Sequence, residues 1–267
     1  MPLIELAIGR NCEFARQGDK VTCVTLDASK ALPKSASMID IRPFNSLGHA
    51  NHGWLDAHHH FSFANYHDPK RMGWGRIRVW NDDTIGAKSG FPPHPHRDME
   101  IVTYVRSGAI THQDSMGNKG RTAAGDVQVM SAGTGVMHAE YNLEDEATTL
   151  FQIWIETDKP SASPSWGAMP FPKESRNGAF QLLASGDPRD GALTINADAK
   201  ILGATVNAGG SIAIDTEPGR HLYLVPSGRV RVNGIEAQPR DGIAITGEKK
   251  IQIEAEDDGE LVLVDAR

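Results

Sequence analysis

Two histidines stand two positions apart at the start of a β-type run. They are His94 and His96, in the stretch FPPHPHRDMEIVTYVRSG. Side chains two apart on a strand point to the same side, so both imidazoles can reach one point. The prolines around them remove backbone donors, which places the pair at the edge or the irregular beginning of a strand. The pattern predicts two ligands of a metal ion.

A second pair with the same spacing lies further along the chain. His138 and Glu140, in SAGTGVMHAEYN, also fall two apart on an expected strand. Three imidazoles and one carboxylate suit Fe, Mn, Ni, Cu or Zn. One isolated pair of histidines is usually a surface or structural feature, but two such pairs beside turn-rich segments arise less often by chance. We therefore expect both pairs to meet at one site.

Glu100 is a rival for the carboxylate position. It lies four residues after His96, and on one continuous strand that spacing would put it on the same face. Spacing alone leaves Glu100 and Glu140 as alternatives.

Short β-type segments separated by turns must position these residues. They include RIRVWNDDTI, EIVTYV, AITHQD, DVQVM and TLFQIWIE, and this spacing predicts an antiparallel sandwich or barrel. A proline-rich stretch then reads as a connection, and a second set of strands follows it. We expect an N-terminal extension (1–37), a metal-binding barrel (38–160), a connecting segment (161–177) and a second barrel (178–267).

The two sets of strands indicate an internal duplication. TYVRSGAITH aligns with YLVPSGRVRV, which places Gly108 on Gly228. The same alignment places Ile214 at the position of His94. It places Thr216 at the position of His96. The C-terminal barrel should therefore bind no metal and act as support or cover.

Composition excludes several classes of protein. The net charge is −7 and Lys and Arg form no cluster, so we expect no direct binding to nucleic acid. Cys12 and Cys23 have no zinc-ribbon spacing, which favours a reducing compartment. The N-terminus does not read as a secretory signal and no run is long enough to span a membrane. We predict a cytoplasmic monomer.

The remaining histidines have ordinary explanations. Consecutive residues of a strand alternate faces, so the run from His58 to His60 cannot offer all three rings to one ion. We expect these to make structural hydrogen bonds. Four others are isolated and predicted to be satisfied surface or core residues: His49, His52, His67 and His112. The chain has neither a GxSxG nor a phosphate-loop motif.

The two histidine motifs resemble those of the pirin family of cupins. FPPHPHRDMEIVTYVRSG and GDVQVMSAGTGVMHAEYN carry the resemblance, together with the upstream GHANHGWLDAHHHFSFANYHDPKRMGWGRIRVWNDD. It is strong from Met38 to Glu156, fainter to Arg267, and does not cover residues 1–37. It implies an all-β bicupin, with two antiparallel barrels face to face and one metal in the first.

The resemblance also implies a ligand set. Carried over residue by residue, the ligands are His94, His96, His138 and Glu140, and not Glu100. The metal is most often iron in such proteins, here Fe(II), with Zn, Mn, Ni, Co and Cu as alternatives.

Two functions follow from the resemblance. Several members are similar to quercetin 2,3-dioxygenases, which implies a flavonol-like aromatic substrate, dioxygen, and release of carbon monoxide. Glu140 would stay a ligand or take the hydroxyl proton as a general base. The alternative is a non-enzymatic iron-binding protein that acts as a redox-sensitive regulator through a protein partner. A third interpretation is a metal-bound β-barrel with other chemistry, such as isomerisation.

Overall fold

The computed structural model describes residues 12–17, 20–25 and 37–267. Within the predicted extension, β1 (Cys12–Gln17) and β2 (Lys20–Thr25) pair with each other in antiparallel register. The rest of that extension, up to residue 36, lies outside the described residues. The chain from 37 onward belongs to a second compact unit.

The N-terminal half of this second unit consists of two antiparallel sheets. The larger has the order β14-β11-β8-β13-β6-β5-β4 and the smaller has the order β10-β9-β12-β7. The strands of the larger sheet are β4 (Gly48–Asn51), β5 (Leu55–His59), β6 (Ile77–Ile85), β8 (Met99–Ser107), β11 (Val127–Ser131), β13 (Thr148–Glu156) and β14 (Ser165–Met169). Those of the smaller sheet are β7 (Ser89–His96), β9 (Ala109–Asp114), β10 (Lys119–Ala123) and β12 (Val136–Asn142).

The C-terminal half repeats this plan. Its sheets have the orders β16-β15-β17-β24-β19-β22-β3 and β18-β23-β20-β21. The larger contains β3 (Met38–Arg42), β15 (Gln181–Ser185), β16 (Leu193–Thr194), β17 (Ala199–Val206), β19 (His221–Pro226), β22 (Gly242–Thr246) and β24 (Gly259–Ala266). The smaller contains β18 (Ser211–Asp215), β20 (Val230–Val232), β21 (Ile235–Ala237) and β23 (Lys250–Ala255). The 3₁₀ turns are η1 (Phe44–Ser46), η2 (Lys173–Arg176) and η3 (Pro188–Asp190).

The repeated strand order supports the predicted duplication. The order β11-β8-β13-β6-β5 in one half corresponds to β22-β19-β24-β17-β15 in the other, and the smaller sheets match strand for strand. The strands β8 and β19, which carry the aligned TYVRSG and YLVPSG segments, occupy the same place. By the same correspondence β18, which contains Ile214, replaces β7 and its two histidines.

The all-β prediction is confirmed, but each half is a sandwich of two sheets and not a closed barrel. The chain passes from the larger to the smaller sheet at corners, and the strand ladder stops there. Gly108, between β8 and β9, is such a corner: its φ is +74°, and a Cβ there would meet Thr148 Oγ1 at 2.4 Å. Glycine takes this conformation without steric cost.

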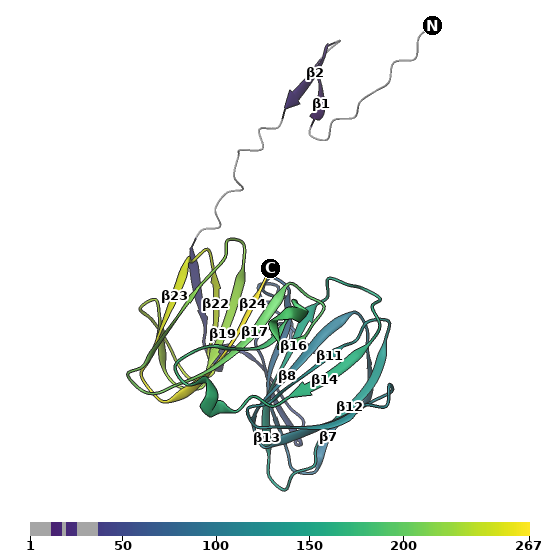
Figure 1. The fold of residues 1–267 in the computed structure, drawn as a ribbon, viewed down its shortest axis with the longest axis vertical. Helices are drawn as coiled ribbons and strands as arrows, with labels where there is room; N and C mark the ends of the chain where they lie inside the picture. The colour runs from purple at the N-terminus through teal and green to yellow at the C-terminus, as the bar shows by residue number, and fades with distance from the viewer. Residues whose placement is uncertain (1–11, 18–19, 26–36) are drawn as a thin grey trace. The chain divides into compact units, whose positions relative to one another are not determined.

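Two segments pair outside the domains to which the predicted domain boundaries assign them. Met38–Arg42, expected at the start of the first barrel, pairs as β3 with β22 of the other half. Figure 1 shows this purple strand among the yellow and green ones. Part of the expected connection forms β14, which pairs with β11. Both strands cover a sheet edge, which leaves fewer unpaired backbone groups.

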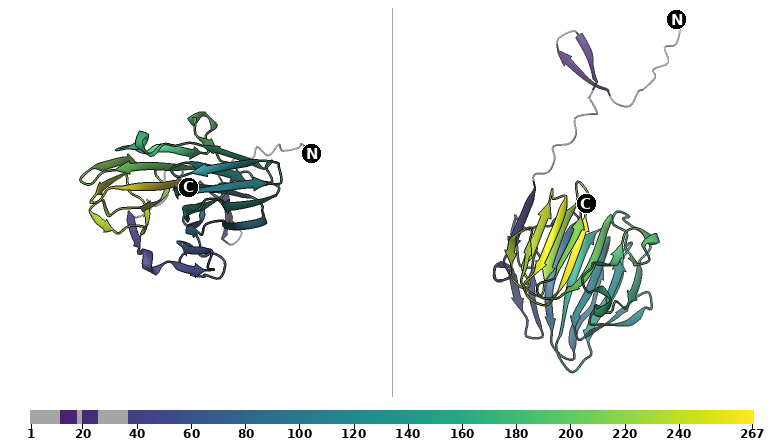
Figure 2. Two further views of the ribbon diagram at one scale, coloured as in Figure 1. Left: turned by 90° about the horizontal axis from the view of Figure 1, so that it is seen from below. Right: turned by 60° about the vertical axis from the view of Figure 1, so that its left-hand side comes forward.

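The two larger sheets share one hydrophobic core. Buried side chains from both halves form a single cluster, including Trp80, Tyr104, Phe151 and Tyr223. Figure 2 shows the yellow and green strands lying beside the teal and blue ones. Separate clusters fill the interior of each sandwich. None of the helices in the described ranges has the length and apolar character that a membrane crossing needs.

Candidate metal centre

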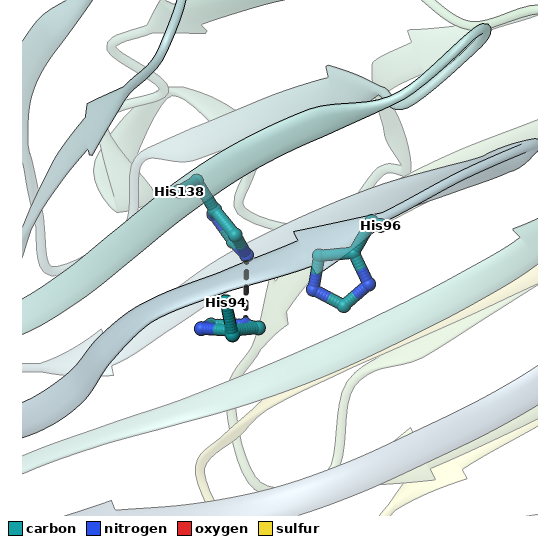
Figure 3. A group of neighbouring side chains, drawn as sticks. All are labelled: His94, His96 and His138. Carbon is teal, nitrogen blue, oxygen red and sulfur yellow. Dashed lines mark hydrogen bonds between the residues drawn. The ribbon is translucent and has the colours of Figure 1, made fainter.

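Three of the predicted ligands converge inside the N-terminal sandwich. His94 and His96 lie on β7, and His138 lies on the adjacent β12, directly opposite His94 in the antiparallel register. One ring nitrogen from each of the three histidines lies within 4.8 Å of those of the other two. Figure 3 shows the three rings from neighbouring strands turned toward one point. The spacing of two therefore does place both β7 imidazoles on one face.

Glu140 stands next to this group. It lies two residues after His138, beyond a shift in the β12–β7 register, and its carboxylate is within 4.8 Å of the His138 ring. All four residues line one cavity of about 190 Å³. The structure thus brings the predicted set together, although its role as a ligand set stays a prediction.

The rings of His94 and His138 face each other through their Nε2 atoms. His94 Nδ1 lies 2.8 Å from the carbonyl oxygen of Pro92, so Nδ1 must carry the proton. His112 Nε2 lies 3.0 Å from the Asp114 carboxylate, so His112 is protonated there and its Nδ1 can accept from His138 Nδ1 at 3.5 Å. The Nε2 atoms of His94 and His138 are 3.0 Å apart, so at most one of them carries a proton.

The two Nε2 atoms can share one proton of His138 or bind one cation. A divalent cation would take the place of that proton, and the outer hydrogen bonds of His94 and His112 would orient the rings toward it. Burial and the neighbouring imidazoles lower the pKa of His138 to about 3, and burial and His94 lower that of His96 to about 4. Both rings are therefore neutral at pH 7 and able to bind a metal. The donor set fits a divalent ion.

Amide side chains from the opposite sheet fix the Glu140 carboxylate. Gln128 Nε2 donates to Oε1 at 2.7 Å and Gln152 Nε2 donates to Oε2 at 2.7 Å, with Thr103 Oγ1 also 3.2 Å from Oε1. Burial raises the pKa of Glu140, whereas His112 and the hydrogen bonds from Gln152 and Thr103 act in the opposite direction. Oε2 accepts only from Gln152 and keeps a further lone pair for a metal.

Glu100 does not join the group. A turn at Asp98, with φ of +47°, separates β7 from β8, so strand parity does not carry over from His96. Glu100 faces away from the cavity and accepts hydrogen bonds from Ser131 Oγ and, at 3.0 Å, from the backbone N of Asn196. The expectation that Glu100 shares the face of His96 was wrong.

The run of three histidines separates as predicted. His59 lines the cavity and its Nδ1 is 2.8 Å from Asn81 Oδ1, whereas His60 Nδ1 is 3.0 Å from the Tyr223 hydroxyl. His58 stacks on His49 on another face, and its buried Nδ1 has no hydrogen-bond partner among the described residues, so the structural hydrogen bond expected for this ring is not found. With Asp56 these two form a further group of metal-binding residue types at the surface.

Sequence reasoning missed His112. It was expected to be an isolated, satisfied residue, yet it is fully buried and links Asp114 to His138. The signal was present, because His112 and Asp114 also have a spacing of two on a strand. The polar row of Gln128, Thr103 and Gln152 carried no comparable pattern.

Comparison with known proteins identifies the family. The model of the Pirin family matches residues 40–155, and that of the quercetinase C-terminal cupin domain matches residues 182–266. A pirin-like protein of Caulobacter vibrioides is 60% identical over 231 residues, which cover 86% of this chain and 100% of the relative. The chain belongs to the pirin family.

One curated relative and one crystal structure, both from Escherichia coli, extend the comparison of this pirin. One, named quercetin 2,3-dioxygenase, is 44% identical over 230 residues, 85% of this chain and 98% of the relative. The crystal structure of the bacterial pirin YhhW in complex with nickel(II) covers 86% of this pirin and 99% of its own chain, with a TM-score of 0.81 and 43% identity. The bicupin architecture is thus shared with a solved structure.

Proposed function

We propose that this pirin is a metal-dependent dioxygenase that cleaves flavonols such as quercetin. The reaction would insert both atoms of dioxygen and release carbon monoxide. The supporting observation is the convergence of His94, His96, His138 and Glu140 on the wall of a cavity whose other walls are mainly apolar and aromatic. The name of the Escherichia coli relative points to the same reaction.

The proposed ligands are the three imidazoles and the Glu140 carboxylate, holding one metal ion per chain. Fe(II) is the first candidate, and Zn, Mn, Ni, Co and Cu are alternatives that the same nitrogen and oxygen donors accept. When bound, the metal would supply a Lewis acid that polarises a substrate oxygen.

Glu140 is the proposed proton acceptor for the flavonol hydroxyl. The pKa of Glu140 is raised, which brings it closer to the pKa of the hydroxyl that Glu140 must deprotonate. A general base is more effective when these two pKa values lie closer together. Gln128 and Gln152 hold both carboxylate oxygens, so the group keeps its direction while the proton moves.

The cavity walls fit a flat aromatic molecule. Phe63, Phe91 and Trp154 line the cavity, and Trp154 also packs edge-on against His96 with ring centroids 4.9 Å apart. A second hollow of about 570 Å³ shares Phe63, Phe91 and three more lining residues with it. Together they offer a path from the surface and an apolar site that excludes water.

The proposal can be tested by oxygen consumption. Protein loaded with Fe(II), or with one of the alternative metals, should consume dioxygen with quercetin and release an equal amount of carbon monoxide. Glu140→Gln should bind quercetin but consume oxygen at least about 100-fold more slowly. Asp56→Asn, on the outer face of β5, is the matched control and should behave as wild type.

One outcome would favour the regulator instead. Metal-loaded protein that binds quercetin with no oxygen consumption under any of these metals would contradict the dioxygenase. A metal-dependent protein partner would then be the next object of study.

A further inference from the structure

Two adjacent carboxyl groups on β6 have opposite surroundings. Asp82 and Asp83 are both buried, and strand alternation sends their side chains to opposite faces of the sheet. Asp82 pairs with Arg106 and with Arg240, whose Nε lies 2.7 Å away. Asp83 faces the cavity that holds the histidines. The two arginines thus pair with Asp82, whereas Asp83 has no cation from the described ranges bound to it.

Asp83 also lacks a hydrogen-bond donor. Its Oδ1 is buried and has no partner within the described part of the chain. The residues opposite it in the ladder are Ala57 on β5 and Leu150 on β13, whose side chains have nothing to donate. An unsatisfied buried polar group destabilises the fold, so its retention requires an explanation.

The neighbouring polar residues of the cavity do have partners. Asn81, two residues earlier on the same face, has its Oδ1 2.8 Å from His59 Nδ1. Both oxygens of Glu140 accept from glutamine amides. Asp83 is therefore the exception among the acidic and amide side chains that line this cavity.

Asp83 is suited to pair with a hydroxyl group. Burial, followed by the charges of Asp82 and Glu140, raises its pKa well above the ordinary value. A carboxyl that stays protonated offers one donor and one acceptor, which matches an alcohol or a phenol and gives a cation no advantage.

We propose that Asp83 is a substrate-binding residue that pairs with a ring hydroxyl of a polyhydroxylated aromatic substrate, at a distance from the oxygens that react. This assignment rests on the proposed function and narrows it. The enzyme would prefer substrates with hydroxyls on the rings over those that carry only the reacting hydroxyl and carbonyl. A site built to hydrogen-bond a substrate hydroxyl discriminates strongly against an analogue that lacks it.

Two flavonols distinguish substrate binding by Asp83 from an effect on metal binding. Quercetin has ring hydroxyls, whereas 3-hydroxyflavone keeps only the 3-hydroxyl and the 4-carbonyl. Binding is measured without oxygen on protein loaded with nickel(II), from the absorbance of the flavonol. Wild type should bind quercetin about tenfold more tightly than 3-hydroxyflavone, and Asp83→Leu should lose most of that difference.

Three controls accompany the titration. Asp83→Asn keeps a donor and an acceptor and should retain an affinity within about threefold of wild type. Nickel content, measured by elemental analysis, should be unchanged in both variants. The metal-free Asp83→Leu protein should melt at the same temperature as wild type or higher, since the variant removes a carboxyl without a partner.

The outcomes distinguish this assignment from the function on which it rests. If wild-type protein binds neither flavonol, the proposed function fails and Asp83 loses its role with it. If wild type binds both and Asp83→Leu keeps the full preference for quercetin, only the role of Asp83 is overturned. A lower melting temperature of Asp83→Leu together with equal losses for both flavonols would show a structural role instead.

Discussion

Gln152 donates a hydrogen bond from Nε2 to Oε2 of Glu140 across the space between two sheets, at 2.7 Å. The amide lies on β13 of the larger sheet and the carboxylate on β12 of the smaller one. The contact therefore ties the site to the sheet that also forms the core shared with the C-terminal half. The direction of the Glu140 carboxylate therefore depends on residues outside the proposed ligand set.

Replacing this amide should weaken metal binding. In Gln152→Leu one Glu140 oxygen loses its donor, so the pKa of the carboxyl rises further and its orientation is less restricted. We expect metal affinity to fall about tenfold, measured by competition with a chromogenic chelator. The exposed Gln113, changed to Leu on the same sheet as Glu140, should leave the affinity unchanged. Equal affinities of Gln152→Leu and wild type would contradict this account.

Asp114 should act on the metal through two imidazoles. In Asp114→Asn the His112 ring loses the carboxylate that fixes its Nε2 proton, so His138 can no longer rely on His112 Nδ1 as an acceptor. We expect a 10–100-fold loss of metal affinity, as when such outer partners of ligands are changed. Long-range ¹⁵N spectra of the imidazoles should show a mixed His138 tautomer in the metal-free variant and a single one in wild type. An unchanged His138 tautomer in Asp114→Asn would contradict the proposed link from Asp114 through His112 to His138.

Strand parity predicted much of this centre from the sequence, and it failed where a strand ended. His94 and His96 lie on one strand without a register shift between them, so a spacing of two was sufficient. Glu100 lies after the turn at Asp98, so the alternation of faces on its strand no longer follows that of His96. His112 was missed because its importance comes from its position beside His138 on the next strand, which depends on pairing between β9 and β12. The pairing of β3 with β22 is likewise a long-range relation that local patterns do not contain.

The two rival carboxylates should respond differently to the same substitution. Glu140→Gln removes the charge beside His138 and should reduce metal affinity at least tenfold. Glu100→Gln should keep the metal at full occupancy, because Glu100 bonds to Ser131 and Asn196 away from the cavity. Its cost should appear as a loss of about 1 kcal/mol of unfolding free energy. The reverse ranking in elemental analysis would restore Glu100 as a ligand.

The metal-free protein should lose stability in acid. The imidazole of His138 has a pKa near 6.5 in the unfolded chain and about 3 in the fold, so the unfolded state binds a proton first. Its contribution is complete above pH 6.5 and is lost as the pH falls toward 3, by about 1.4 kcal/mol for each pH unit. Urea unfolding between pH 7.5 and 4.5 should show a shallower decline for His138→Leu than for wild type. Parallel declines would contradict the assigned pKa.

One metal ion should bind per chain, in the N-terminal sandwich. Among residues 37–267, the groups of three or more metal-binding residue types all lie in that half, and β18 offers Ile214 where β7 offers its histidines. His221→Ala should keep the metal, because that ring lies edge-on to Trp74 with centroids 5.2 Å apart and outside those groups. His138→Ala should lose it. A second equivalent that survives in His138→Ala and disappears in His58→Ala would mean that the surface group of His49, Asp56 and His58 also binds metal. That result would leave the cavity site intact but make the stoichiometry two.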